Sequence, residues 1–123
     1  MSTPGLIKAH KAAGAVAPRR LVALNASGNV VQASATADAI IGVSELGADA
    51  GKTCDVIHSH IADIEFGGAV NPGDFVTADA EGKAVAAAPA AGVNARVGGI
   101  AILDAVAGDI RPVLLNLTQI QGE

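Results

Sequence analysis

The chain has 123 residues, half of them hydrophobic, and its 12 acidic and 8 basic residues give a formal net charge of −4. This length fits one domain, and a net negative charge with only two aromatic residues excludes nucleic-acid binding through a basic, aromatic surface. No segment has the ~20 consecutive apolar residues of a membrane-spanning helix. Lys8, His10 and Lys11 interrupt the region where a secretory signal would be apolar. We therefore expect a soluble protein made in the cytoplasm, with no membrane partner.

The first 13 residues are predicted to form an extended N-terminal arm. Pro4–Gly5 is a turn signal that interrupts regular structure, and Leu6 and Ile7 would be poorly covered on their own. The segment has no recognisable counterpart in the repeated sequence that follows it, and such arms commonly pair with a neighbouring chain or stay disordered. We expect residues 14–123 to form a single β domain.

The first β unit is predicted to begin with a hairpin. Its turn is Asn25–Gly28, in which the glycine allows the positive φ that a tight hairpin turn requires. Short runs rich in valine and isoleucine, separated by polar turns, indicate the remaining strands. The strands of this unit are expected at residues 19–24, 29–32, 40–44, 53–58 and 61–66.

The second unit follows the same plan. Its strands are expected at residues 74–78, 83–87, 97–103 and 110–117. Gly98–Gly99 predicts a bulge or a close approach of backbones within the third of these strands. Pro112 cannot donate a hydrogen bond to a neighbouring strand, so it is expected at a sheet edge or a bulge.

The two units are related in sequence, as residues 14–66 and 68–120. At an offset of 54 positions, Gly14, Ala15, Val16, Pro18, Val22, Ala26, Gly28 and Val31 recur as Gly68, Ala69, Val70, Pro72, Val76, Ala80, Gly82 and Val85. At an offset of 57, Gly42, Leu46, Ala48, Ala50, Gly51 and Val56 recur as Gly99, Leu103, Ala105, Ala107, Gly108 and Val113. The domain is therefore predicted to be built twice from one β unit.

Frequent turn signals between short valine-rich and isoleucine-rich runs predict an all-β barrel or sandwich. The alternative is a mixed fold with one short helix at residues 34–39 or 101–107, where alanine favours helix. Because alanine and valine bury little area, the core should be weak. We expect burial between copies of the chain to supply part of the stability.

Three residues suggest possible chemistry. His58 and His60 form an H-x-H pair that, on a strand, would share one face and could bind a metal. Cys54 could act as a nucleophile with one of these histidines as base. Nothing nearby completes a metal-ligand pattern, and a lone cysteine in a strand is more often a small buried residue, so no metal site and no catalytic site are assigned.

Lys83 lies next to the turn of the second hairpin. Duplicated β domains that carry lipoyl or biotinyl groups display a lysine at such a turn. In the first unit the corresponding residue is Asn29, so the two turns share the preceding glycine, Gly28 or Gly82, and not a lysine. Lys83 is therefore interpreted as a solvated turn residue, and no cofactor is assigned.

Three sequence features together resemble the capsid cement proteins of tailed phages, also called head decoration proteins. They are the duplicated hairpin pattern P-x-x-hydrophobic-V … G-x-hydrophobic-V, the sequence IIGVSE at Ile40–Glu45, and the sequence IRPVLLNL at Ile110–Leu117. The resemblance runs from about Gly14 to the C-terminus.

This resemblance implies a small β-barrel or β-tulip-like domain with no catalytic motif and no cofactor. It implies a structural virion protein that binds the outer surface of an expanded icosahedral head, whose major capsid protein is of the HK97 type, usually as a homotrimer. In that family an N-terminal arm often contacts the shell. The corresponding residues here are Thr3, Pro4, Leu6, Ile7 and Lys8.

Two other functions remain open from the sequence. One is a non-catalytic carrier or adaptor β domain within a larger assembly, for which Lys83 is the residue to examine. The other is a metal-binding enzyme domain that uses His58, His60 and Cys54.

Overall fold

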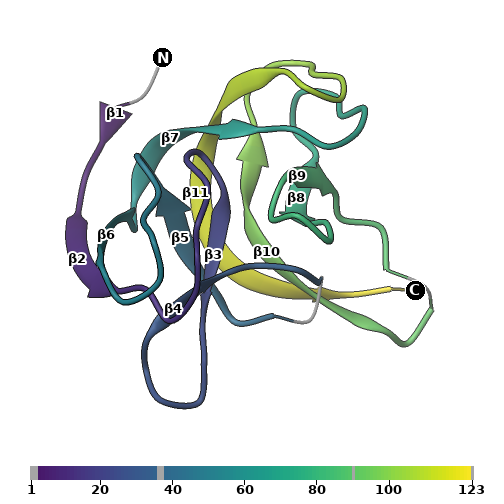
Figure 1. Cartoon of the computed structure of the whole chain (residues 1–123). Coiled ribbons are helices and arrows are strands. Elements are labelled where there is room, and N and C mark those ends of the chain that lie inside the picture. The colour runs from purple at the N-terminus through teal and green to yellow at the C-terminus, as the bar shows by residue number, and fades with distance from the viewer. Residues whose placement is uncertain (1–2, 36–37, 90, 123) are drawn as a thin grey trace.

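The computed structural model describes residues 3–35, 38–89 and 91–122 (Figure 1). These residues form strands, turns and bends and no helix, so the predicted all-β class is confirmed. The strands are β1 (Thr3–Pro4), β2 (Ile7–Lys11), β3 (Leu21–Leu24), β4 (Val30–Gln32), β5 (Ile40–Ser44), β6 (Thr53–Ile57), β7 (His60–Glu65), β8 (Phe75–Ala78), β9 (Ala84–Ala86), β10 (Asn94–Ala101) and β11 (Ile110–Gln121). A helix with the length and hydrophobicity needed to span a membrane is absent from this part of the chain.

The strands form two antiparallel sheets that lie side by side (Figure 1). The first sheet has the order β2-β6-β5-β3-β4, and the second has the order β1-β7-β11-β10-β8-β9. Without β1, the second order follows from the first when five is added to each strand number, so that β2 corresponds to β7 and β6 corresponds to β11. The sequence repeat therefore corresponds to two β units with one topology, of which the first contains β2 to β6 and the second contains β7 to β11. The strand predicted at residues 61–66 thus belongs to the second unit, and its assignment to the first unit is wrong.

Backbone hydrogen bonds repeat between the units in detail. Val16 forms an isolated bridge with Ala48, and Val70 forms the same bridge with Ala105. The side chain of Asn25 accepts hydrogen bonds from two backbone N–H groups of the first hairpin turn, and Asp79 does the same in the second. These side chains fix each turn by mimicking a backbone turn, which explains why asparagine or aspartate occupies this position.

Part of the predicted arm lies inside the fold. Strand β2 pairs with β6 along residues 7–11, in the same way that β7 pairs with β11. The expectation that the whole arm has no counterpart in the repeat is therefore wrong for these residues. Their sequence does not resemble β7 because β2 is mostly exposed at a sheet edge, whereas β7 lies between β1 and β11 and buries alternate residues.

Most predicted strands begin and end within two residues of the observed ones, and residues 40–44 agree at both ends. Strands β10 and β11 are longer than expected because they pair with each other as far as Asn94 and Gln121. The register shifts between Val97 and Gly99, which confirms the predicted bulge. Pro112 lies on β11, which has β7 on one side and β10 on the other. The pairing with β10 ends at Val113, so Pro112 pairs with β7 alone.

Neither sheet closes into a barrel, which corrects the predicted architecture. Each sheet curls until strands that are not neighbours in the sheet meet at a single bridge. Ala12, after β2, bridges to Val30 on β4 in the first sheet, and Phe66, after β7, bridges to Ala84 on β9 in the second, but no ladder joins these strands. The alternative helix at residues 101–107 is replaced by the end of β10 followed by bends and a bridge. The other alternative, at 34–39, lies partly outside the described residues.

The apolar residues form two clusters. The smaller one lies on one face of the first sheet and consists of Ala12, Val16, Val22, Val30, Cys54 and Val56. The counterparts of these residues in the second sheet include Val76 and Val113, which belong to the larger cluster. That cluster also contains Leu21, Val43 and Ile57 from the opposite face of the first sheet. Equivalent faces of the two units are therefore not packed against each other, and the units stack face to back.

Candidate functional site

The histidines of the H-x-H pair do not share a face. Strand β6 ends at Ile57 and β7 begins at His60, whose positive φ of 70° turns the chain between them. His60 Nδ1 lies 3.0 Å from the hydroxyl of Ser59, whereas His58 reaches a different partner. No group of three or more His, Cys, Asp or Glu residues in the described ranges is placed to hold a metal ion.

His58 instead pairs with His10, a residue that the sequence did not single out. The Nε2 atoms of the two rings are 2.9 Å apart, and His58 Nδ1 lies 2.7 Å from the backbone carbonyl oxygen of Ile41. Because a carbonyl oxygen can only accept, His58 Nδ1 carries a proton, and one further proton joins the two Nε2 atoms. Burial lowers the pKa of His10, and the neighbouring His58 and Lys8 act in the same direction. The pair holds β2 against the end of β6.

Cys54 is fully buried within the smaller apolar cluster. Burial raises the pKa of its thiol, and the nearby carboxylate of Asp55 acts in the same direction. A nucleophilic cysteine needs an accessible thiolate, and this environment favours the protonated thiol. Its position on β6 matches the interpretation of a lone cysteine as a small core residue.

Lys83 is held in an ion-pair cluster beside the second hairpin turn. Its Nζ lies 3.3 Å from Glu65 and 3.9 Å from Glu81, and Arg20 donates to Glu65 over 3.1 Å. The hydrogen bond from Arg20 lowers the pKa of Glu65, and Lys83 acts in the same direction. Because Arg20 directly precedes β3 of the first sheet and Glu65 lies on β7 of the second sheet, the cluster joins the two sheets.

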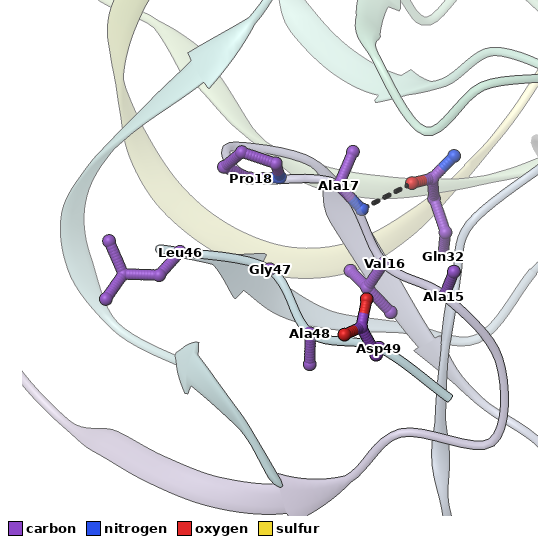
Figure 2. A pocket seen from close by; sticks show the side chains of 9 residues that line it. All are labelled: Ala15, Val16, Ala17, Pro18, Gln32, Leu46, Gly47, Ala48 and Asp49. Atoms are coloured by element: carbon purple, nitrogen blue, oxygen red, sulfur yellow. Dashed lines mark hydrogen bonds between the residues drawn. The ribbon is translucent and has the colours of Figure 1, made fainter. Parts of the chain in front are cut away.

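A surface hollow lies between the turns that flank Val16 and Ala48 and has a volume of about 690 Å³ (Figure 2). It is broad and shallow. Figure 2 shows the side chain of Gln32 reaching the backbone N–H of Ala17, which donates to Gln32 Oε1 over 3.0 Å. Asp49 is the only titratable residue in its lining, so the hollow lacks the convergent polar groups of a small-molecule site.

The predicted capsid-binding residues lie along one edge of the molecule. Thr3 and Pro4 form β1, which pairs with β7, and the next turn is held by hydrogen bonds to Ser59 and His58. Leu6 and Ile7 remain 59% and 42% exposed. The segment is therefore held in place by its own chain while it presents apolar side chains to the outside.

Large apolar side chains are also exposed on the second unit. They are Phe75, Val93, Ile102, Leu103, Val106, Ile110, Leu114 and Leu117. Large apolar side chains that remain exposed together on one face of a domain are typical of an interaction surface. The strongest candidates for a functional site are thus surfaces, and they lie on the second sheet and along the N-terminal edge.

Comparisons with known proteins give one informative likeness. No family model matches the chain, and no curated protein matches it. Among solved structures, the chain is similar to the N base of the head fiber gp8.5 of bacteriophage phi29, with a TM-score of 0.68 and 18% sequence identity. The likeness covers 94% of this chain and 98% of the phage chain, so the two share one fold over almost their whole length.

Proposed function

We propose that this chain is a structural virion protein that binds the outer surface of an icosahedral phage head and stabilises its expanded shell. One observation carries the proposal: the fold matches that of a head fiber base over 94% of this chain and 98% of the other. The likeness is to a complete two-sheet body rather than to a single hairpin. The sequence resemblance to head decoration proteins, which rests on different features, supports the same role.

The mechanism needs only a difference in affinity. A protein that binds the expanded shell more tightly than the contracted or ruptured shell shifts the population toward the expanded state. The exposed apolar residues of the second sheet and of the N-terminal edge offer a surface for such binding. No catalytic step is needed, and in this proposal the chain is not an enzyme.

The proposed partner is the major capsid protein of an HK97-type shell, and the proposed form of the chain is a homotrimer. Copies joined in a trimer would bind several shell subunits at once, so that weak single contacts add through effective concentration. In this proposal Leu6 and Ile7, which are exposed at the N-terminal edge, belong to the contact with the shell.

The test is a binding and rupture experiment with expanded heads assembled from the phage's own major capsid protein, without this chain. Purified protein should co-sediment with the heads and saturate at a fixed number of copies per head. Heads that carry it should release their contents at a higher temperature than bare heads. Failure to bind, or identical rupture temperatures at saturation, would contradict the proposal.

A further inference from the structure

A row of apolar side chains crosses the outer face of the second sheet. By strand register the row is Ile61 on β7, Leu114 on β11, Ile100 on β10 and Phe75 on β8. Partners in an antiparallel ladder project from the same face of the sheet. Phe75 and Leu114 are 40% and 45% exposed, and the other two are partly buried. We call these four residues the outer row.

The first sheet contains the same row at equivalent positions. Its members are Ile7, Ile57, Val43 and Leu21, which precede the outer-row residues by 54 or 57 positions and share their register. Here Leu21, Val43 and Ile57 are at most 2% exposed because they pack in the larger cluster against the second unit. One row is thus covered within the chain, while the equivalent row on the second sheet keeps Phe75 and Leu114 exposed among the described residues.

The surface that covers the first row shows what such a row requires. It includes Ile64, Leu115 and the bare backbone of Gly98, where an added Cβ would lie 2.8 Å from Leu21 Cδ2. The equivalent positions in the first unit are held by bulkier or polar residues: His10, His58 and Ile41. The first unit of a second copy therefore cannot cover the outer row in the way that the second unit covers the first row. The histidine pair thus prevents copies of the chain from stacking head to tail.

The size of the outer row argues against a simple dimer through this face. Phe75, Leu114 and the neighbouring Ile110 are each exposed by 40–47%, and side chains of this size would together bury on the order of 200 Å². A stable interface buries about 800 Å² on each partner. The row therefore suits a partner that offers the same site many times to linked copies, as a shell does.

The outer row also adjoins the N-terminal edge. Thr3 pairs with Ile61, so β1 extends the sheet beyond the end of the row. The row therefore ends beside the strand from which the chain continues to Leu6 and Ile7.

We propose that the outer row is the docking surface for an apolar, sheet-like surface of the shell protein, lined by aliphatic side chains. This inference rests on the proposed function, since it names the face through which the chain would bind a head. It adds that the described residues leave this face open, and that the histidines of the first unit keep other copies from covering it.

The test compares two leucine variants of nearly equal exposure. Leu114→Asp changes the outer row, and Leu24→Asp changes a leucine that is 41% exposed at the end of β3, outside the row. Binding of each to expanded heads is measured by co-sedimentation, with far-ultraviolet circular dichroism and thermal unfolding as checks of folding. The expected result is at least tenfold weaker binding for Leu114→Asp and less than twofold change for Leu24→Asp.

Each outcome is decisive. If the unmodified chain binds heads and Leu114→Asp binds equally well, the docking surface is wrong while the proposed function stands. If the unmodified chain does not bind heads, both are overturned. A change of oligomeric state caused by Leu114→Asp would overturn the inference by showing that the row joins copies of the chain. Should Leu114→Asp fail to fold, Phe75→Ser is judged by the same binding criterion.

Discussion

The tight curl of each sheet should depend on one glycine in its middle strand. A Cβ added at Gly99 would lie inside the van der Waals distance of the Leu114 carbonyl oxygen and 2.7 Å from Val113 Cγ1. A Cβ added at Gly42 would meet the Ile57 carbonyl oxygen and Val56 Cγ1 in the same way. The obstructing atoms are backbone atoms and buried side chains, so neither can move aside without opening the sheet.

We therefore expect Gly99→Ala and Gly42→Ala each to lower the free energy of unfolding by about 2 kcal/mol, as overpacking in a filled core does. For a chain of this length that corresponds to a fall in Tm of roughly 5–12 °C. Gly14→Ala is the matched control, because nothing lies within 4 Å of its added Cβ and its φ is not positive. The control should change stability by less than about 0.5 kcal/mol or raise it slightly.

The assay is urea unfolding followed by circular dichroism, with the slope m compared between variants so that only folded-state effects are counted. The reasoning is refuted if both alanine variants at the curled positions unfold within 0.5 kcal/mol of the unmodified chain. It is also refuted if Gly14→Ala is as destabilising as they are. Unequal effects at Gly42 and Gly99 would show that the two units differ in packing at a point where their geometry agrees.

Two further predictions concern the first unit. Arg19 has a φ of +57°, and Gly73, at the same position of the second unit, has a φ of +91°. Gly73→Ala should lower the free energy of unfolding by about 1–2 kcal/mol because it places a Cβ in the left-handed region, whereas Arg19→Ala should be nearly neutral because a Cβ is already there. Equal effects of the two substitutions in urea unfolding would contradict this. The pKa of His10 is lowered in the folded chain, so at acidic pH the unfolded chain binds more protons than the folded chain. The contribution of His10 to the free energy of unfolding is therefore fully present above pH ~6.5 and is lost as the pH falls through the pKa of the folded chain. Thermal unfolding at pH 7.5 and 5.5 should show this loss, and His10→Gln should reduce it; an unchanged pH dependence in that variant would count against the histidine pair.

Local turn chemistry explains what the sequence predicted well. Gly28 and Gly82 have positive φ values of 80° and 74° in the two hairpin turns, as their position after asparagine or aspartate indicated. The strand at residues 40–44 and the bulge at Gly98–Gly99 were also predicted, because they depend on residues that are adjacent in the chain.

Features that depend on distant residues could not be predicted. Val22 and Val76 occupy the same position in the repeat, yet they lie in different apolar clusters because the units stack face to back. The pairing of His10 with His58 depends on the register of β2 on β6, which no local pattern specifies. A strand that begins before the recognisable repeat, as β2 does, is visible only once its partner is known.

We propose that the two-sheet body sits on the outside of a phage head and docks through its second sheet. Electron cryo-microscopy of heads that carry the chain is the direct test. We expect density for both sheets on the outer surface at regular lattice positions, with Phe75 and Leu114 turned toward the shell. Density for the chain inside the head or in the tail, or an outer row facing away from the shell, would contradict it.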